Sequence, residues 1–266
     1  MKKRLVFFIY VDVKYKDSKL YDLHLYNLEK YIKCFDFCTF HLSFSEFSKE
    51  NLDFANELMC RIMAFSSEKD IEFKFRHNSI FREADCFEEE VISRIKNETK
   101  EIVFFAHARG LTFGLNESNL MWISAMYYFN LNFVDDVDRH FLTTTSRPQK
   151  IFYGFPMSYC DKSRGEKYNW FYPGTFFWIK CDSVNFFSEM FKLKLYEKHD
   201  RCFAEDFPGC SFWPEFAATH RDLCVEERYI FGINFMGAIN EYFGKIGTDD
   251  GFYNYYGEIC DYLNSI

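Results

Sequence analysis

The hydrophobic positions in about the first hundred residues fall into two alternating patterns. Short runs rich in Val, Ile and Phe have the length and composition of buried strands. These runs are Leu5–Val11, Phe37–Phe44, Ile71–Phe75 and Ile102–Ala106. Between them, apolar residues recur at offsets of three and four, which predicts helices. The helical stretches are Leu20–Lys33, the segment that carries Ala55, Met59 and Met63, and the segment from Ala84 to Ile95.

The alternation of strand and helix predicts an α/β fold with a mostly parallel central sheet and helices on both faces. The second half of the chain is less regular, and its expected elements are a helix at Leu120–Phe133, strands at Ile151–Phe155 and Phe176–Lys180, and helices at Asp182–Phe191, Glu226–Phe243 and Phe252–Leu263. No internal repeat or linker interrupts the chain, so we expect a single domain over residues 1–266.

Composition adds a large aromatic core and an acidic surface to this picture. Hydrophobic residues make up 48% of the 266 residues, with 35 Phe and 18 Tyr, most of which we expect in the core. The formal net charge of −8 argues against a general nucleic-acid-binding protein, which needs a basic face for phosphates. A local cationic pocket for one diphosphate stays compatible with an acidic chain.

The cysteines and the apolar runs indicate where in the cell the protein is located. The ten cysteines are scattered without a Cys-x-x-Cys pair, which favours a reducing, cytoplasmic location and no structural metal. The basic Met1–Arg4 and the apolar run after it resemble a leader, but Asp12 interrupts that run and a first strand is the better interpretation. No run approaches the roughly 20 apolar residues that a membrane span needs.

Candidate chemistry gathers where two predicted strands end. Asp12 follows the first strand, and His107 and Arg109 follow the fourth. Ligands of open α/β sheets bind beyond the carboxyl ends of the strands, so these residues share the expected edge. Arg pairs with phosphate through two hydrogen bonds, and His can donate one, which indicates an anion site. Alternatively, Arg109 forms a surface salt bridge and the backbone holds His107.

Four short blocks together resemble a known family. They are Phe105–Thr112, Trp122, Gly174–Trp178 and Ala204–Phe207. In this order they resemble the His-Thr-Lys-Gly-like motif, the Trp-containing helix, the Ser-Gly-Asn-Phe-Trp-Trp-like strand and the Ala-Glu before an aromatic residue of the bacterial and viral branch of the GT-A glycosyltransferases. The motifs span about residues 80–215, and the earlier part matches by fold pattern only.

The resemblance implies a GT-A-like, Rossmann-like domain. Residues 1–112 would form the nucleotide-binding half, and residues 113–266 the acceptor and catalytic half. The protein would transfer a sugar from a nucleotide-diphosphate donor, with inversion, to a hydroxyl of a glycan, glycolipid or glycoprotein acceptor. In this fold, the segment before the third helix commonly meets the donor. Arg82 would then reach phosphate and Asp85 a sugar hydroxyl, although both could instead be charges at a helix N-terminus.

The family's usual metal motif is missing from its expected position. An Asp-x-Asp would follow the fourth strand, where this chain has His107–Arg109. We therefore expect cationic diphosphate binding without an absolute need for a divalent metal, Mn²⁺ or Mg²⁺. Asp136–Asp138 is better explained as the acidic end of the Leu120–Phe133 helix and Asp249–Gly251 as a turn, while a lone His220 is more often structural.

The acid for catalysis falls in the last block. An inverting transfer needs a carboxylate that takes the acceptor proton, and Asp206 is the first candidate, with Glu205 close behind. Trp170, Tyr172 and Trp178 could stack on acceptor sugar rings. Gly174 would let a backbone amide approach the donor. The competing interpretations are an acidic pair on an exposed loop and ordinary core aromatics.

Three other functions compete with this hypothesis. A different nucleotide-dependent α/β protein is disfavoured, because the chain has no Gly-x-Gly-x-x-Gly and no phosphate-binding Gly-x-x-x-x-Gly-Lys loop. A glycoside hydrolase would also use two carboxylates, but the cationic strand end fits a phosphate leaving group better. A non-catalytic nucleotide-sugar or carbohydrate-binding protein with a degenerate glycosyltransferase fold remains the main alternative.

Overall fold

The computed structural model describes residues 1–66, 69–108, 110–111, 114–142, 152–154, 157–159, 170–171, 175–182, 230–231 and 250–266. The strands are β1 (Lys2–Val11), β2 (Phe37–Phe44), β3 (Asp70–His77), β4 (Glu101–His107), β5 (Phe152–Gly154), β6 (Met157–Tyr159), β7 (Trp170–Phe171), β8 (Phe177–Lys180) and β9 (Ile230–Phe231). The helices are α1 (Lys19–Tyr31), α2 (Lys49–Ala64), α3 (Glu83–Phe87), α4 (Ser93–Lys96), α5 (Glu117–Leu131), α6 (Val134–Leu142) and α11 (Asp250–Ser265), with short turns η1 (Val13–Tyr15) and η2 (Ile32–Cys34) and a π-helical turn η3 (Glu88–Ile92).

A six-stranded sheet in the order β3-β2-β1-β4-β8-β5 forms the centre of the protein. Its first four strands are parallel neighbours, while β8 runs antiparallel to both β4 and β5. The fold is therefore α/β, as predicted, but the sheet is mixed and the prediction of a mostly parallel sheet is wrong. Strands β6, β7 and β9 form a separate small sheet.

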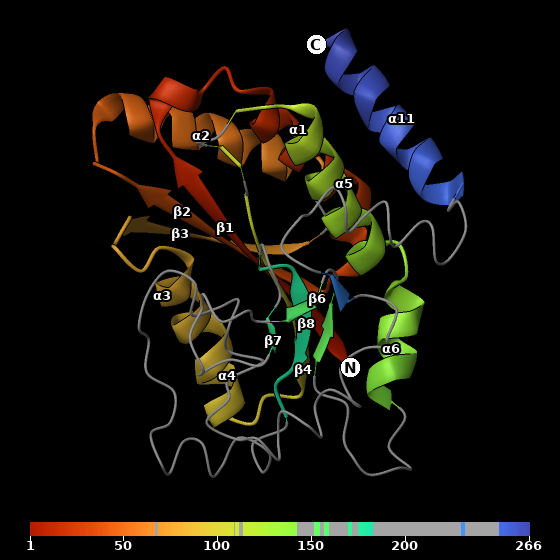
Figure 1. Cartoon of the computed structure of the whole chain (residues 1–266). Coiled ribbons are helices and arrows are strands. Elements are labelled where there is room, and N and C mark those ends of the chain that lie inside the picture. Colours follow the sequence, from red (N-terminus) through yellow and green to blue (C-terminus); the bar gives the residue numbers. More distant parts are fainter. Residues whose placement is uncertain are drawn as a thin grey trace.

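Helices cover both faces of the six-stranded sheet (Figure 1). On one face, α1, α2, α5 and α11 bury the aromatic core, in which Phe7, Phe40 and Phe104 have essentially no exposed surface. On the other face, the continuous helical stretch of α3, η3 and α4 packs Phe87 against Phe105 and Phe177. A strand buried on both faces needs apolar residues at nearly every position, which explains the unbroken hydrophobic runs of β1 and β4.

The four predicted strands of the first half and the helices between them are confirmed. Several predictions for the second half of the chain need correction. The helix expected at Leu120–Phe133 ends at Leu131, and Asp136–Asp138 lies within a second helix, α6, rather than at a helix end. That helix forms because Val137 and Phe141 lie one turn apart and are both buried against the core.

Within the predicted helix Glu226–Phe243, Ile230–Phe231 form strand β9, which pairs with β6. The helix prediction is wrong at these two residues, because a β-branched and an aromatic residue also suit a strand and tertiary pairing decides between the two. The helix predicted at Phe252–Leu263 is confirmed as α11, but this helix begins at Asp250, so the turn predicted at Asp249–Gly251 is wrong at Asp250 and Gly251. The helix predicted after Asp182 lies outside the described residues.

Candidate functional site

The order of the strands marks one place in the sheet as a candidate binding crevice. The chain proceeds from β1 to β2 and β3 on one side, then returns to place β4 on the other side of β1. Such a reversal opens a crevice at the carboxyl ends of the two strands beside it. Asp12 directly follows β1, and His107 is the last residue of β4. The sequence thus correctly predicted that both residues lie at this edge.

The two residues are not side by side. His107 is paired with Phe8 in the β1–β4 register, and the amide of Ala108 donates to the Phe8 carbonyl at 2.8 Å. Strand β1 continues to Val11, so Asp12 lies about 13 Å further along the strand direction, at about 3.3 Å per residue. A ligand that contacts both residues must therefore be extended.

Asp12 has a structural role in the described protein. It is the N-cap of η1: its carboxylate accepts from the Lys14 amide at 3.1 Å and from the Tyr10 hydroxyl at 3.0 Å, and it lies 2.9 Å from the Lys14 ammonium. Burial disfavours the charge, but these hydrogen bonds more than compensate, so the pKa of the Asp12 carboxyl is lowered. Asp12 is ionised at neutral pH and holds Lys14 at the crevice.

His107 faces the start of the helical stretch on the second face of the sheet. Its Nδ1 lies 3.9 Å from the Glu83 carboxylate, and both side chains are about 13% exposed. Its ring also meets Phe176 edge-on at 6.3 Å. A protonated imidazole would be stabilised by Glu83 and could donate to an anion. Glu83 was part of the predicted segment but was not itself predicted to contact His107.

Arg82 and Asp85 flank Glu83. Arg82 is exposed and adopts φ 49° and ψ −120°, a conformation that non-glycine residues rarely take. Asp85 lies in the first turn of α3 and accepts a short hydrogen bond from the Ser79 hydroxyl. This bond supports the alternative interpretation for Asp85, in which the carboxylate stabilises the start of the helix. The charged segment at the start of α3 does lie beside the end of β4, as the proximity of Glu83 and His107 shows.

Thr175 is a residue of this region that the sequence analysis missed. It is fully buried, its φ is +56°, and its hydroxyl has no hydrogen-bond partner among the described residues. It precedes Phe176, whose ring contacts His107. A β-branched residue with positive φ and an orphaned hydroxyl is doubly unfavourable, and such strain concentrates at functional sites. Sequence could not reveal it, since Thr carries no preference for this conformation.

The structure corrects the prediction for Trp178. This residue is in β8 with no exposed surface; it stacks on Phe35 at 5.4 Å, and its indole nitrogen donates to the Asn130 carbonyl at 2.9 Å. A fully buried, fully paired Trp has no ring face left for an acceptor sugar, so Trp178 belongs to the core. The alternation along the antiparallel strand explains this, because Trp178 points to the same face as Phe176.

The remaining predicted site residues stay predictions. Trp170 lies in β7, which pairs with β6, but its side chain is not described. Arg109, Tyr172, Gly174, Glu205 and Asp206 lie outside the described residues. The described part of the site thus consists of the ends of β1 and β4, the Arg82–Asp85 segment and Thr175.

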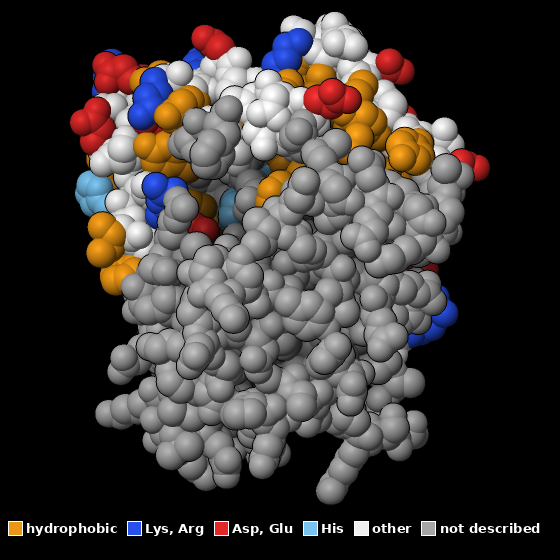
Figure 2. All heavy atoms as spheres, in the orientation of Figure 1, with side chains coloured by type: hydrophobic (Ala, Val, Ile, Leu, Met, Phe, Trp, Pro, Cys, Tyr) orange, Lys and Arg blue, Asp and Glu red, His pale blue; other side chains and the backbone are white. Residues whose placement is uncertain are grey.

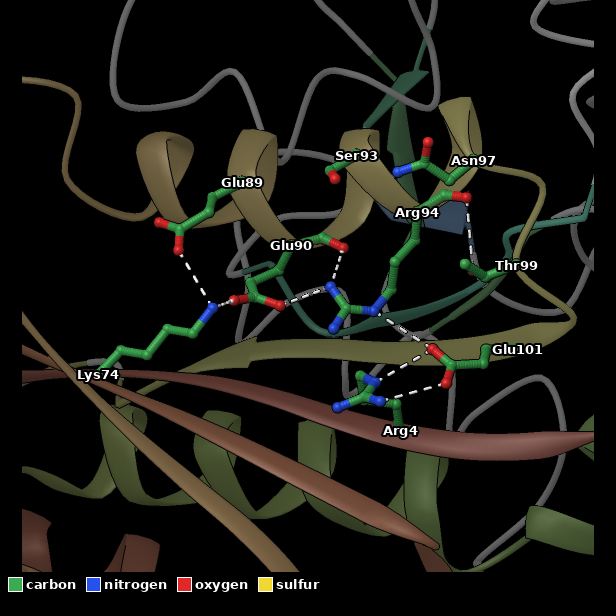
Figure 3. A pocket seen from close by; sticks show the side chains of 9 residues that line it. All are labelled: Arg4, Lys74, Glu89, Glu90, Ser93, Arg94, Asn97, Thr99 and Glu101. Carbon is green, nitrogen blue, oxygen red and sulfur yellow. Dashed lines mark hydrogen bonds and ion pairs between the residues drawn. The ribbon is translucent and has the colours of Figure 1, made fainter.

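A polar cavity lies at the opposite, amino-terminal end of the strands, beneath η3 and α4. It has a volume of about 500 Å³ and is lined by charged and polar side chains: Arg4, Lys74, Glu89, Glu90, Ser93, Arg94, Asn97, Thr99 and Glu101 (Figure 3). Its three basic and three acidic side chains pair with one another, so its charge is balanced. A balanced, internally paired cavity gives an anionic ligand no advantage, and we assign it a structural role.

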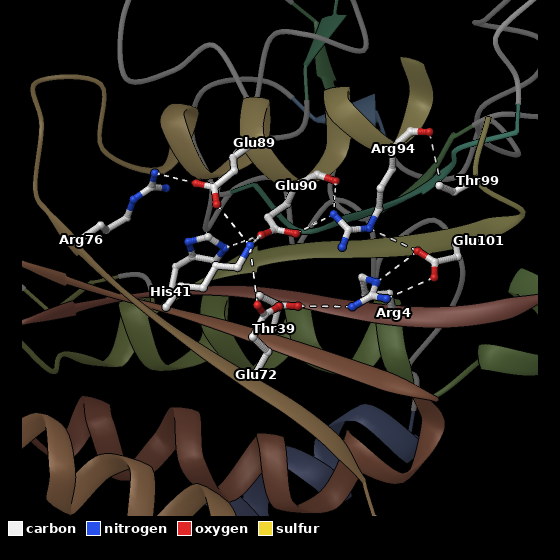
Figure 4. Close-up of polar contacts among 11 residues, drawn as sticks. Arg4, Thr39, His41, Glu72, Arg76, Glu89, Glu90, Arg94, Thr99 and Glu101 are labelled. Atoms are coloured by element: carbon white, nitrogen blue, oxygen red, sulfur yellow. Dashed lines mark hydrogen bonds and ion pairs between the residues drawn. The ribbon is translucent and has the colours of Figure 1, made fainter. Parts of the chain in front are cut away.

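Glu90 is the centre of this ion network (Figure 4). Its carboxylate lies 3.1 Å from the His41 Nε2, 2.5 Å from the Lys74 ammonium and 2.5 Å from the Arg94 guanidinium. Arg94 continues to Glu101, which also receives two hydrogen bonds from Arg4. Burial alone would raise the pKa of Glu90, but its three partners hold that pKa far below the ordinary value.

His41, Glu89 and Glu90 also form the one three-ligand metal geometry found in the described part of the chain. The ammonium of Lys74 lies between the two carboxylates, 3.2 Å from Glu89 and 2.5 Å from Glu90. The cation that a metal would supply is therefore provided by the protein itself, and Lys74 would have to leave before a metal could enter.

Comparison with protein-family models and with curated proteins finds no match for this chain. None of the helices described has both the length and the apolar character needed to cross a bilayer. An extended, partly anionic ligand fits an edge that combines Lys14, His107 and Arg82.

Proposed function

We propose that this protein is a glycosyltransferase that moves a sugar from a nucleotide-diphosphate donor to the hydroxyl of a glycan, glycolipid or glycoprotein acceptor. The supporting observation is the group of residues at the end of β4, beside the reversal of strand order. There, His107 with Glu83, the strained Arg82 and the strained, buried Thr175 meet the end of β4. Arg82 and Thr175 each precede a residue that contacts His107, and backbone strain of this kind concentrates at functional sites.

The chemistry demands two kinds of group. The bond between the anomeric carbon and the phosphate oxygen breaks, and its electron pair stays on the departing diphosphate. Protonated His107, with Arg82 and Arg109, would stabilise that charge. The acceptor oxygen forms the new bond to carbon from the opposite face and gives up its proton to a carboxylate, for which we propose Asp206, with Glu205 as its neighbour.

The finer fold assignment belongs to the same proposal. Four parallel strands with a reversal beside β1 are compatible with a Rossmann-like nucleotide-binding half, and the GT-A-like assignment rests on the motif resemblance. The cytoplasmic location is likewise proposed from the scattered cysteines. A divalent metal bridging the diphosphate is allowed by this proposal but not required by it.

Donor binding is the first test. A panel of nucleotide-diphosphate sugars, with and without Mn²⁺ or Mg²⁺, would be screened by thermal shift, and the best donor measured by titration calorimetry. We expect His107→Ala to weaken the affinity about tenfold, the value of one charge-assisted hydrogen bond. His77→Ala is the matched control, since His77 is the last residue of β3, two strands away from β1. If no nucleotide sugar stabilises the protein, the proposal is overturned.

Turnover is the second test, and it separates an enzyme from a binding protein. Donor hydrolysis would be followed by release of the nucleoside diphosphate from wild type and from Asp206→Asn. We expect the variant to bind the donor normally but to release the diphosphate at least a hundredfold more slowly, the range of general-base effects being about 10²–10⁴. Binding without turnover in wild type would favour the non-catalytic alternative.

A further inference from the structure

Strand β3 is an edge strand with an unusually regular outer side. Among the described strands it pairs only with β2, over eight consecutive residues without a bulge. It contains no proline, and Phe75 at its outer end is 48% exposed. Hydrophobic and basic side chains are visible at the left margin of Figure 2, where Figure 1 places the end of β3. Bulges, prolines and very short edges normally prevent one edge from pairing with another.

The contacts of β3 fix which side chains lie on which face. Ile71 and Phe73 pack against the aromatic core, and Phe75 lies 5.7 Å from Phe44 on the same side. Lys74 and Arg76 lie on the opposite face, where both contact Glu89. Since side chains alternate along a strand, Asp70 and Glu72 share the face of Lys74 and Arg76. One face of the edge is thus apolar, and the other changes from acidic to basic along its length.

We propose that this edge pairs with the same strand of a second copy of the chain, antiparallel, about a two-fold axis through Phe73. This register places Asp70 opposite Arg76 and Glu72 opposite Lys74, and each pair occurs twice. On the other face, Ile71 lies opposite Phe75, and Phe73 opposite its own copy. The two six-stranded sheets would form one continuous sheet. The contact is isologous, as in most homodimers, and therefore closes with two copies.

Alternative registers are less favourable. The two-fold axis keeps each face on its own side, so a register can shift only by placing another residue of the strand on the axis. Placing Glu72 there brings two carboxylates together, and placing Lys74 there brings two ammonium groups together. Like charges directly opposite each other destabilise a strand pair. Phe73 is the central residue that avoids both conflicts and pairs every neighbouring charge with its opposite.

The charges are available to a second strand. Asp70 and Glu72 are exposed, and the Glu72 side chain keeps 55% of its surface. Lys74 keeps 31% of its side-chain surface although it also contacts Glu90, and it already lies 3.9 Å from Glu72 within its own strand. Lys74 can therefore contact a second carboxylate without leaving the first. The inference is independent of the proposed function.

The test is the oligomeric state of the full chain. Sedimentation equilibrium or light scattering after size exclusion should give twice the chain mass at micromolar concentration. Glu72→Lys replaces two attractive pairs with two repulsive ones, and we expect it to raise the dissociation constant about tenfold or more. Glu72→Gln removes the attraction alone and should give a smaller increase. Circular dichroism would verify that each variant is folded.

Glu50→Lys, an exposed acidic residue in the first turn of α2, is the matched control and should leave the dissociation constant unchanged. A wild-type monomer at about 100 μM, a concentration well above the micromolar dissociation constants of ordinary specific dimers, would overturn the proposal. A dimer that Glu72→Lys does not weaken would overturn the assignment to β3.

Cross-linking tests the proposed strand register directly. Directly opposed side chains in an antiparallel pair have Cβ atoms about 5 Å apart. A mixture of Ile71→Cys and Phe75→Cys chains, treated with a short bismaleimide, should yield a peptide that links positions 71 and 75. Phe75→Cys alone should not link to itself, because Ile71 lies opposite it. Cross-linking of position 75 to itself, with none between 71 and 75, would contradict the two-fold axis through Phe73.

Discussion

Three non-glycine residues in the described chain adopt a positive φ: Arg82, Glu98 and Thr175. Glu98 has an ordinary explanation. It follows the end of α4, where the Thr99 amide donates to the Arg94 carbonyl and the Glu98 amide to the Ile95 carbonyl, the pattern of a helix C-terminus that favours glycine. Arg82 and Thr175 lack such an explanation, and each precedes a residue that contacts His107, Glu83 and Phe176 respectively. The positive φ of Glu98 is therefore explained by the helix end, whereas we attribute the positive φ of Arg82 and Thr175 to ligand binding.

Replacing each exposed strained residue with glycine should distinguish these two cases. Arg82→Gly and Glu98→Gly should each raise the free energy of unfolding by about 1 kcal/mol, because glycine adopts positive φ without steric cost. Urea denaturation would measure the gain. Only Arg82→Gly should weaken nucleotide-sugar binding, by about tenfold for one lost phosphate contact. Thus the Glu98 variant is the matched control for the Arg82 variant.

The two outcomes bear on different claims. If Arg82→Gly is stabilising but leaves donor affinity intact, Arg82 has no role in the donor site, while the explanation of its strain stands. Should Arg82→Gly instead lower the free energy of unfolding, the side chain contributes packing or charge interactions that outweigh the backbone cost. A destabilising Glu98→Gly would contradict the helix-terminus argument itself.

Among the elements, β8 is a strand whose position the sequence predicted well and whose role it predicted wrongly. Its position was predicted within one residue, but its direction and its buried face were not. Direction depends on which strand it pairs with, and a four-residue run carries no signal of that partner. The same run of aromatic residues that resembled a sugar-binding strand is the centre of the core, where Trp178, Phe104 and Phe35 stack.

Trp178 variants test this correction. Trp178→Phe keeps most of the packing but leaves the Asn130 carbonyl without its donor, and should lower the free energy of unfolding by about 2 kcal/mol. Trp178→Ala also opens a cavity and should lower it by about 4 kcal/mol. Tyr253→Ala, at a half-exposed ring on α11, should change it by less than about 0.5 kcal/mol. Chemical denaturation would measure all three.

If Trp178→Phe left the free energy of unfolding unchanged and raised only the KM for an acceptor, the core assignment of Trp178 would be wrong. We expect the reverse pattern. Loss of stability should leave the donor affinity of the folded fraction unaltered, because no described contact of Trp178 reaches the residues at the ends of β1 and β4.

The sequence predicted the parts of the fold that depend on neighbouring residues and not the parts that depend on contacts between distant ones. The first four strands depend on local hydrophobic runs, and the helix at residues 84–95 on a local period, so both were predictable. The pairing of β8, the Ile230–Phe231 strand and the φ of Thr175 are set by tertiary contacts that no local window contains. For the site, the positions of Asp12 and His107 directly after or at the end of predicted strands correctly placed both at the carboxyl edge of the sheet. It could not foresee that Asp12 caps a turn and is occupied by Lys14.

At the scale of the whole molecule, the ion network joins parts of the chain that lie far apart in sequence. Arg4 on β1 contacts Glu101 at the start of β4, and Glu101 contacts Arg94. Arg94 in turn contacts Glu90 on η3, which also contacts Lys74 on β3 (Figure 3). Glu90 is about 1% exposed, so its charge depends entirely on these partners. Removing one member of a buried pair leaves an uncompensated charge, a cost that exceeds the net value of the pair.

The network predicts an acid-sensitive fold. The pKa values of Glu90 and Glu101 are lowered in the folded protein, for Glu90 by His41, Lys74 and Arg94 and for Glu101 by Arg4 and Arg94, in each case against the opposing effect of burial. The unfolded chain therefore binds more protons than the folded one just below pH 4.5, the ordinary value of Glu. The stabilisation is complete above that pH and is lost as the pH falls further.

Glu90→Gln should lower the free energy of unfolding at pH 7 by about 3 kcal/mol, since it leaves Lys74 and Arg94 without their buried partner. It should also flatten the pH dependence between about pH 4.5 and 3, removing up to about 1.4 kcal/mol per pH unit, the contribution of one proton. Urea denaturation at successive pH values would measure both effects. Asp53→Asn, at an exposed side chain of α2, is the control and should alter neither.

A particular outcome would refute this account of the network. If Glu90→Gln were as stable as wild type at pH 7, the attraction between Glu90 and its partners would only balance the free-energy cost of burying these charges. A similar balance is found when both members of a buried ion pair are replaced by apolar residues. The pH dependence would then decide between two explanations. A wild-type slope that persists in Glu90→Gln must come from Glu101 with Arg4 and Arg94, whereas a slope that disappears assigns the acid sensitivity to Glu90 even without a net gain at neutral pH.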